Sequence, residues 1–257
     1  MQAMFVYQET APVPALRPWL DCVWTCRVHA RDRPMAHQVL PDNCIDILCQ
    51  DQQDASFAVG MMTAPIQVVS CGLVQTVAAR FKPGAAARFF QLPLCELNDG
   101  RTELRQLWGR ELAARLGDAL WTQPLPDTQR MQILQDFLLL RLRSQPAPSM
   151  SSLALHAVAL IDNARGDLRV EQLAAQLHVS RQHLALQFRQ HVGISPKLFA
   201  RISRFRAVNS ALKTLPAHAD WAQVALQYGY FDQSHLIHDF RDFARASPDA
   251  WLARHRA

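Results

Sequence analysis

The chain has 257 residues, of which 49% are hydrophobic and 19% are charged. This is ordinary globular composition, which excludes a mainly disordered or fibrous protein, and the length favours two domains. No stretch approaches the ~20 apolar residues that a membrane span needs, and the first residues form no signal segment. We therefore expect a cytoplasmic protein without a membrane partner.

The formal net charge of +5 lies in the C-terminal part of the sequence. Residues 150–257 carry 13 Lys and Arg against 8 Asp and Glu, whereas residues 1–149 carry 14 of each. A basic domain beside a neutral one is the distribution expected when one of the two binds a polyanion such as DNA.

The first domain, residues 1–146, reads as β-rich with helices at its end. Residues 39–81 form short apolar pieces, rich in β-branched residues and separated by Gly, Pro and Asp-Asn, which predicts a small sandwich or barrel. Helical periodicity follows in residues 84–92, 103–120 and 131–142. The run Ser-Gln-Pro-Ala-Pro-Ser at 144–149 cannot continue a helix, so we place the interdomain linker there.

The cysteines and histidines of this domain argue against metal chemistry. All six cysteines lie in it, but the pair Cys22 and Cys26 has no second pair to complete a tetrahedral site. His29 and His37 are its only histidines and form no His-x-His pair. We expect buried cysteines rather than a redox site, and no catalytic residue, metal or cofactor.

Three charged residues near predicted strand ends, Asp42, Asp46 and Arg80, have two interpretations. They could line an effector pocket, or they could be turn caps and surface ion pairs. The sequence does not decide between these, and it assigns no effector-binding residue.

Residues 150–257 read as an all-α domain of seven short helices, with no strand-like run between them. The predicted helices are residues 153–163, 170–177, 181–192, 197–214, 221–227, 233–243 and about 249–255.

Residues 170–189 predict a helix-turn-helix. Leu173 and Ala174 form one apolar face, and the small Ala174 lets two helices cross closely. Ser180 is a good N-cap for the second helix, from which Leu184 and Phe188 face back into the first. Such a second helix can enter a DNA major groove about 12 Å wide.

The same pattern recurs 52 residues later, and an internal repeat is a stronger signal than a single motif. The matching positions are Ser180 with Asp232, Leu184 with Leu236, Phe188 with Phe240, and Ser195-Pro196 with Ser247-Pro248. The helix between the two units, residues 197–214, would be ~27 Å long. That length suits two recognition helices in successive major grooves, ~34 Å apart.

Two runs in this part, FRQHVGISP at 188–196 and ALQYGYFDQSHLIHDF at 225–240, resemble the AraC/XylS family of bacterial transcription regulators. The runs LPDNCIDIL at 40–48 and ARFKPG at 79–84 resemble the cupin-like sensor domain that some members carry. The resemblance implies an α+β multidomain fold, with a cupin-like sensor or dimerisation domain followed by a double helix-turn-helix domain. It also implies binding to double-stranded promoter DNA, and activation by contact with RNA polymerase.

Two departures from the family pattern stand out. Where the first unit has Gly193 after its recognition helix, the second has Arg245, so a left-handed cap there must be adopted by a non-glycine residue. Leu186 and His238 stand where many relatives have a base-reading Arg, and neither can make the bidentate guanine contact. Base preference therefore does not transfer from relatives.

Ten outward-facing residues are the candidate DNA contacts. On the first recognition helix they are Arg181, Gln182, Ala185, Leu186 and Arg189, and on the second they are Gln233, Ser234, Ile237, His238 and Arg241. Gln182, Ser234 and His238 are the expected base readers, because Gln can bond adenine bidentately and His can donate to a purine. Arg189 and Arg241, further along each helix, are expected to hold phosphates.

Other side chains of this domain have a structural interpretation. The aromatic residues of the second unit have the spacing of core residues rather than of a base-stacking platform; they are Trp221, Tyr228, Tyr230 and Phe231. The basic residues of the connecting helix could flank the DNA, but pairing with Asp or Glu explains them better; they are Arg201, Arg204, Arg206 and Lys213.

The function predicted from the sequence is a sequence-specific, DNA-binding transcription activator that responds to an unidentified small-molecule effector. The alternative from another class is a cupin-type enzyme with a regulatory DNA-binding tail, but the required cluster of His and carboxylate ligands is missing. A third interpretation makes the first domain a dimerisation module of a homodimer.

Overall fold

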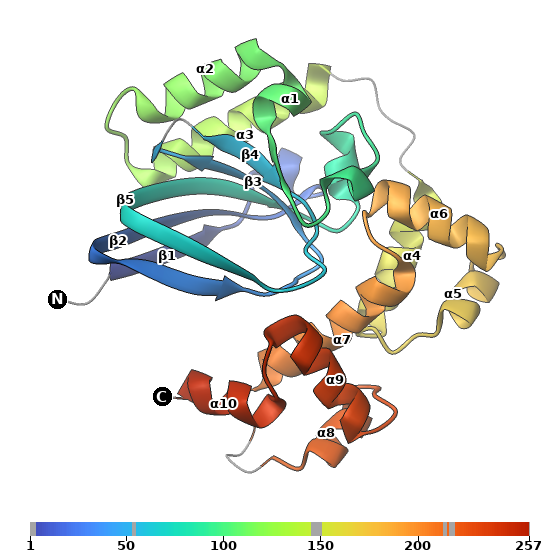
Figure 1. Cartoon of the computed structure of the whole chain (residues 1–257). Coiled ribbons are helices and arrows are strands. Elements are labelled where there is room, and N and C mark those ends of the chain that lie inside the picture. Colours follow the sequence, from blue (N-terminus) through green and yellow to red (C-terminus); the bar gives the residue numbers. More distant parts are fainter. Residues whose placement is uncertain (1–3, 53–54, 145–150, 213–214, 216–218, 257) are drawn as a thin grey trace.

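The computed structural model describes residues 4–52, 55–144, 151–212, 215 and 219–256. An antiparallel sheet with three helices forms the N-terminal part, and seven helices form the C-terminal part (Figure 1). The two-domain α+β layout predicted from the sequence is confirmed. The interdomain linker predicted at 144–149 lies outside the described residues except for Ser144, where α3 ends.

Six strands make one antiparallel sheet in the order β1-β2-β5-β3-β4-β6. They are β1 (Met4–Thr10), β2 (Leu20–Val39), β3 (Ile45–Gln50), β4 (Ser56–Val59), β5 (Ile66–Phe81) and β6 (Arg101–Glu103). The strand prediction for residues 39–81 is confirmed, but β1 and nearly all of β2 were missed. The predicted sandwich or barrel is instead a single curved sheet.

The two longest strands, β2 and β5, pair with each other along their length and bend together. Pairing runs from Leu20 opposite Phe81 to Val39 opposite Ile66, with a register shift between Ala30 and Met35. Gly72 lies opposite Ala30 with a φ of 71°, a backbone conformation that side chains other than hydrogen disfavour. The bulge bends both strands, so that the sheet curls around a cavity.

Side chains along β3 point alternately into the core and into this cavity. Ile45, Ile47 and Cys49 are fully or almost fully buried in the main core. Asp46 and Leu48 point to the opposite face and line the cavity.

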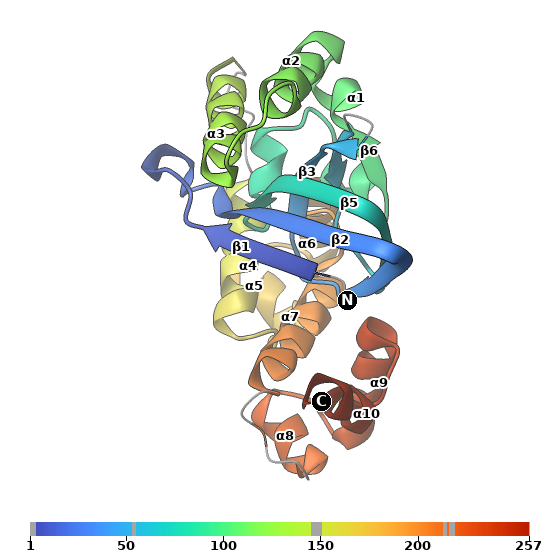
Figure 2. The ribbon, with the colours of Figure 1, turned by 90° about the vertical axis from the view of Figure 1, so that its left-hand side faces the viewer.

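Helices cover the outer face of the sheet, as Figure 2 shows from the side. They are α1 (Leu104–Trp108), α2 (Arg110–Trp121) and α3 (Asp127–Ser144). The single helix predicted over residues 103–120 is wrong, because Gly109 breaks it with φ 88° and ψ 155°. The helix predicted over 84–92 is only the 3-10 turn of Ala85–Arg88.

The C-terminal domain has the seven predicted helices within the part of the chain that the structure describes. They are α4 (Ser152–Asn163), α5 (Val170–Gln176), α6 (Arg181–His191), α7 (Pro196–Ala211), α8 (Trp221–Gln227), α9 (Gln233–Ala244) and α10 (Pro248–Arg256). Polar caps start several of them, as when Ser195 Oγ accepts from the amide of Leu198 at the start of α7. None of the helices in the described ranges is long and apolar enough to cross a membrane.

The helix α7 lies between the two helix-turn-helix units and packs on both (Figure 1). Its Phe199 contacts Phe188 of α6 with ring centroids 5.4 Å apart. Its Phe205 contacts Phe240 of α9 at 5.1 Å. All four rings are fully buried, so one apolar core joins both units to α7.

Candidate functional site

The first helix-turn-helix consists of α5 and α6, joined by a tight turn. His178 adopts a φ of 55° in this turn, and Ser180 Oγ accepts from the amide of His183 at 3.2 Å to start α6. Leu184 and Phe188 are fully buried beneath the exposed face of α6. The motif predicted from the sequence is therefore present in this structure.

The five candidate DNA contacts of α6 lie on its outer side. Arg181, Gln182, Leu186 and Arg189 are exposed, and Ala185 is half-buried. Leu186 is 55% exposed, although a leucine with a purely structural role would be covered. Arg181 forms an exposed ion pair with Glu171 at 3.1 Å, a contact of small energy that DNA phosphates could replace.

The second helix-turn-helix consists of α8 and α9. Asp232 accepts from the amide of His235 at 2.7 Å and so caps α9, as its alignment with Ser180 predicts. The outer residues Gln233, Ser234, His238 and Arg241 are exposed and Ile237 is half-buried, so the side chains on this face match those of α6 in exposure.

A buried ion pair that the sequence analysis missed fixes α9 to α7. Asp239 is completely buried, and the Arg201 guanidinium donates to its Oδ1 at 2.6 and 2.9 Å. The same guanidinium donates to Asp242 at 2.6 Å. The signal was available, because Asp239 stands three residues after Leu236 and four before Phe243, on the inner face of α9.

The base reader predicted at His238 is part of this network. Its Nδ1 lies 3.4 Å from Asp242 and 3.4 Å from Arg201, while its side chain stays 66% exposed. Within the described ranges, His238, Asp239 and Asp242 are the one group close enough to share a metal ion. Since Arg201 already bonds both carboxylates, the geometry is that of an ion-pair network that orients the His238 ring.

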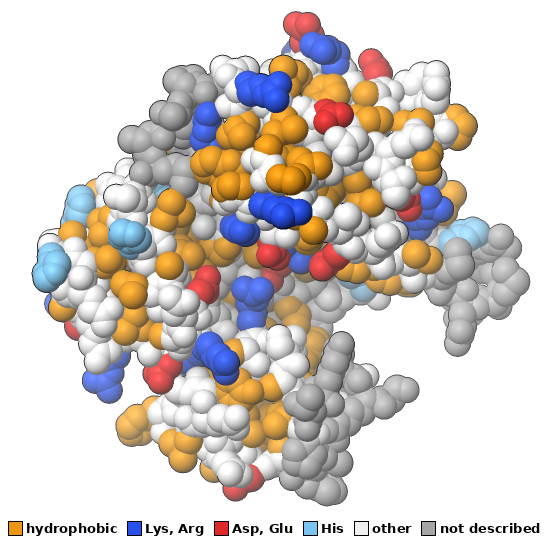
Figure 3. Space-filling model, turned by 180° about the vertical axis from the view of Figure 1, so that it is seen from behind, with side chains coloured by type: hydrophobic (Ala, Val, Ile, Leu, Met, Phe, Trp, Pro, Cys, Tyr) orange, Lys and Arg blue, Asp and Glu red, His pale blue; other side chains and the backbone are white. Residues whose placement is uncertain are grey.

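The prediction that arginines of the connecting helix pair with Asp or Glu is confirmed for Arg201. Arg204 also has contacts, but with a ring and a carbonyl. Its guanidinium lies 5.1 Å from the Tyr230 ring centroid and donates to the Gly229 carbonyl at 3.3 Å. Lys213 lies outside the described residues. On the face seen in Figure 3, acidic and basic side chains mix near the middle instead of forming a patch of one sign.

The aromatic residues of the second unit follow the prediction only in part. Trp221 and Tyr230 are buried and Tyr228 is half-buried, as core residues should be. Phe231 is 86% exposed, so its assignment to the core is wrong. It stands in the turn directly before the cap of α9, where the chain has left the helical periodicity on which the assignment depended.

For the end of the second recognition helix, the sequence left open a left-handed cap on Arg245 or a different ending, and the structure has the left-handed cap. Arg245 has φ 54° and ψ 29° directly after α9. Gly193, at the matching place after α6, has a φ of 116°. The second unit thus keeps the turn of the first with a residue that is strained in it.

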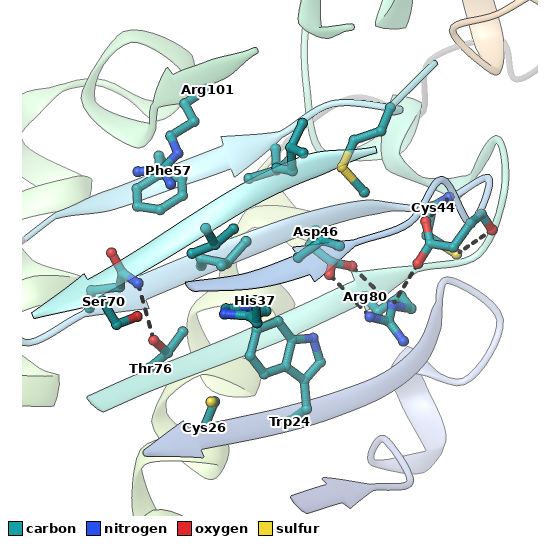
Figure 4. Close-up of a pocket in the computed structure, with 18 of the residues that line it drawn as sticks. Trp24, Cys26, His37, Cys44, Asp46, Phe57, Ser70, Thr76, Arg80 and Arg101 are labelled. Carbon is teal, nitrogen blue, oxygen red and sulfur yellow. Dashed lines mark hydrogen bonds and ion pairs between the residues drawn. The ribbon is translucent and has the colours of Figure 1, made fainter. Parts of the chain in front are cut away.

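A cavity of about 630 Å³ lies in the curl of the N-terminal sheet (Figure 4). Trp24 and His37 lie close together on one side, and Phe57 lies toward the other end beside Arg101. The Tyr7 ring also lines the cavity, 5.5 Å from Trp24. This size and mainly apolar lining are typical of sites for small organic molecules.

The cavity is lined by Asp42, Asp46 and Arg80, the three charged residues for which the sequence left two interpretations open. Arg80 Nε lies 3.4 Å from Asp46 and 3.7 Å from Asp42, and Nη1 reaches Glu9 at 3.5 Å. Burial raises the pKa of Asp46 to about 7, although the adjacent Arg80 guanidinium lowers it. These residues are therefore ion-paired with one another and also line the cavity.

The walls of the cavity also touch the DNA-binding part. Asn43, between the cavity residues Asp42 and Cys44, donates to the carbonyl of Phe199 and to Ser203 Oγ, both at 3.0 Å. These acceptors belong to α7. Asn43 is 1% exposed and has a φ of 62°.

Two further contacts reach the ends of both recognition helices. Gln38, between the cavity residues His37 and Val39, donates to the carbonyl of Ala244, the last residue of α9, at 3.2 Å. Asn98 donates to the carbonyl of Gly193, just past α6, at 2.7 Å. The sequence analysis missed all three interdomain contacts, because each joins residues about a hundred or more positions apart.

Comparison with known families gives two matches. A model described as a helix-turn-helix domain matches residues 173–254, and a domain of unknown function, DUF6597, matches residues 8–103. An uncharacterized HTH-type transcriptional regulator of Haemophilus influenzae is 27% identical over 94 residues. That match spans 37% of this chain and only 31% of the relative.

Among solved structures, ToxT from Vibrio cholerae O395 is loosely similar. Its TM-score is 0.45 at 12% identity, over 96% of this chain and 97% of ToxT. The structure of ToxT bound to (E)-4-(8-methylnaphthalen-1-yl)but-3-enoic acid has a TM-score of 0.41 at 10% identity, over 98% of this chain and 99% of ToxT. The helix-turn-helix match coincides with the two units described above, so the C-terminal part of this chain is a helix-turn-helix domain, joined to an antiparallel sheet domain.

Proposed function

We propose that the chain is a cytoplasmic transcription regulator that binds promoter DNA through α6 and α9 and responds to a small molecule held in the sheet cavity. The observation that carries the proposal is the repeated unit. Two capped helices with matching exposed faces flank one connecting helix, and this supports the proposal that each helix enters one of two successive major grooves.

The exposed residues divide by the contact that each can make. Gln182, near the start of α6, can bond an adenine edge with its amide. Arg189 lies two turns further along and suits a phosphate, which adds affinity and salt dependence but no sequence information. On α9, Ser234 and His238 are the matching candidates for base contacts.

The proposal is tested on duplex DNA that the full-length protein selects from a random pool. Gln182→Ala is expected to change the preferred bases at one position. Arg189→Ala is expected to weaken all sites alike, and to reduce the slope of log affinity against log salt by about one. Gln190→Ala, an exposed neighbour on the same helix, is the matched control and leaves both properties unchanged. Unchanged preference and affinity in both test variants would contradict the assignment of α6.

The cavity supports a regulatory function rather than an enzymatic one. Its charged residues are carboxylates and arginines paired with one another, and His37 is the one histidine among the residues that line it. This set does not supply the three or four ligands that a catalytic metal requires. An enzyme would also not need both walls of its pocket to contact a DNA-binding domain.

In the proposed mechanism, the small molecule changes the relative placement of the two recognition helices. The segments that line the cavity hold α7 through Asn43 and the end of α9 through Gln38. A ligand that displaces either segment therefore changes the population of DNA-competent arrangements. The measurement is DNA affinity with and without ligand in the full-length chain.

Two further partners belong to the same proposal. Contact with RNA polymerase follows from the resemblance to AraC/XylS activators, and in vitro transcription with purified polymerase tests it. A homodimer is supported by exposed apolar side chains on the edge strand β1, where Phe5 and Val6 are 49% and 46% exposed. Analytical ultracentrifugation of the full-length chain tests it.

A further inference from the structure

We propose that the cavity takes a lipophilic organic cation, an amine or quaternary ammonium with an apolar body. This inference rests on the proposed function, since it names the class of molecule to which the regulator responds. It follows from the charge balance around Arg80 and from the aromatic wall beside it.

The charged end of the cavity has more carboxylates than arginines. Two acids that line the cavity, Asp42 and Asp46, lie 3.7 and 3.4 Å from the Arg80 guanidinium, which is the only cation in contact with them among the described cavity residues. Above the pKa of Asp46, which is about 7, these three lining groups have a net charge of −1, and the half-exposed Glu9 lies 3.5 Å from the same guanidinium at the edge of the cluster. A carboxylate ligand would add to this negative charge, whereas a cation would offset it.

One of the acids is also incompletely bonded. Asp46 Oδ1 is inaccessible to solvent and has no partner in hydrogen-bond geometry among the described residues, whereas Oδ2 accepts from Arg80 Nη2 at 3.5 Å and Trp24 lies within reach of the carboxyl. The contact of Oδ1 with Arg80 Nε, at 3.4 Å, is an ion pair outside hydrogen-bond geometry. A buried carboxylate oxygen without a donor favours a ligand that brings an N–H group or a positive charge.

Among the described residues that line the cavity, no other group adds positive charge at this end, and Arg206 approaches Cys44 from outside the cavity. Burial lowers the pKa of His37, so its ring is neutral at pH 7 and above. Burial also raises the thiol pKa of Cys44, which stays protonated. Arg101 lies at the other end of the cavity, where its guanidinium is 4.7 Å from the Phe57 ring centroid (Figure 4).

The wall beside the acids is aromatic and suits the rest of such a ligand. The Tyr7 and Trp24 rings lie 5.5 Å apart, and Phe5 lies 6.5 Å from Tyr7. Aromatic faces attract cations, and their area covers an apolar body. The cavity of about 630 Å³ is large enough for a molecule of drug size.

A matched series of ligands tests the charge preference on the full-length protein. The probes are 4-phenylbutylamine, 4-phenylbutan-1-ol and 4-phenylbutanoate, which share one apolar body and differ in charge at its end. Isothermal titration calorimetry at pH 8 is expected to give an affinity for the ammonium about tenfold above that for the alcohol, with the carboxylate weakest. A carboxylate that binds tightest, equal binding of all three, or no binding of any would overturn the proposal.

Variants locate the effect within the cavity. Asp46→Asn is expected to remove most of the preference for the ammonium over the alcohol. Asp99→Asn, at a cavity carboxylate that accepts from Thr63 and not from Arg80, is the matched control and retains it. Near-UV circular dichroism checks that both variants keep the fold, and the comparison of probes on the unmodified chain does not depend on either variant. Retention of the full preference in folded Asp46→Asn would contradict the assignment.

The outcome is separable from that of the proposed function. Selection of DNA by the ligand-free chain, and its response to Gln182→Ala, involve no probe. If DNA is read by α6 but the ammonium is not preferred, the ligand class is wrong and the DNA-binding function stands. If the ammonium binds but Gln182→Ala and Arg189→Ala change neither DNA preference nor DNA affinity, the ligand class stands and the assignment of α6 to DNA reading is wrong.

Discussion

Replacing Arg201 with alanine tests how the second recognition helix is held in place. Arg201 lies on α7 and donates to Asp239 and Asp242 of α9. Its removal leaves the Asp239 carboxylate completely buried without its cation. Breaking a buried pair in this way costs about 3 to 5 kcal/mol.

The expected loss lies at the lower end of this range. The Arg201 side chain is 22% exposed, so water can partly solvate the carboxylate after truncation. We expect the free energy of unfolding of the C-terminal domain to fall by about 3 kcal/mol. With a urea dependence of about 2 kcal/mol per molar, the midpoint shifts down by about 1.5 M.

Urea unfolding followed by circular dichroism measures the loss, and hydrogen exchange in residues 221–244 locates it. Arg241→Ala, at an exposed arginine on α9, is the control and stays within about 0.5 kcal/mol. In the Asp239→Asn background no buried charge is stranded, so Arg201→Ala should then cost about 2 kcal/mol less. A loss below about 1 kcal/mol, or strict additivity of the two substitutions, would refute the argument.

Three further predictions follow from the interdomain contact, the cavity and the strained cap. Asn43→Gly keeps the left-handed backbone accessible but deletes two hydrogen bonds to α7, so ligand should change DNA affinity less than in the unmodified chain, and the free energy of unfolding should fall by about 1 to 3 kcal/mol; an undiminished ligand response in a DNA-binding assay contradicts it. Because burial raises the pKa of Asp46 to about 7 against an ordinary 3.8, the folded chain holds a proton that the unfolded chain has lost, so stability should decline as pH rises from about 4 to about 7. Asp46→Asn should flatten this decline in urea titrations at several pH values, and an unchanged slope would count against the shift. Arg245→Gly relieves the strain of a φ of 54°, so the free energy of unfolding should rise by about 0.5 to 1 kcal/mol and the melting temperature should rise with it. A lower melting temperature would show that the Arg245 side chain stabilises the fold by more than the strain costs.

The helical domain could be predicted closely, because its signals are local. Caps such as Ser180 and Asp232, and apolar residues at helical spacing, act within a few residues of each other. The helices α8 and α9 begin at the predicted residues for this reason. The error at Phe231 arose where the chain leaves a helix and periodicity no longer indicates which side chains are buried.

The sheet domain was harder to predict, because its strands depend on partners far along the chain. The strand β2 contains charged residues between Arg27 and Arg33 that interrupt its apolar pattern, and its register with β5 shifts between Ala30 and Met35, so no local pattern marks it as one strand. The cavity depends on the bend near Gly72, so no local sequence pattern predicts it. Asp42, Asp46 and Arg80 could be named as candidates from the sequence, but their encounter with Glu9 could not.

The attachment of both recognition helices to one connecting helix has a consequence for how steeply the protein can be regulated. Once α6 is seated on DNA, α9 meets the next groove at an effective concentration set by α7 rather than by diffusion of a second molecule. Tethering of this kind can raise overall affinity by 10² to 10⁴ without new contacts, and it is lost when geometry prevents simultaneous engagement. A small rotation of one unit, transmitted through Gln38 or Asn98, can therefore change promoter occupancy far more than the loss of a single hydrogen bond would suggest.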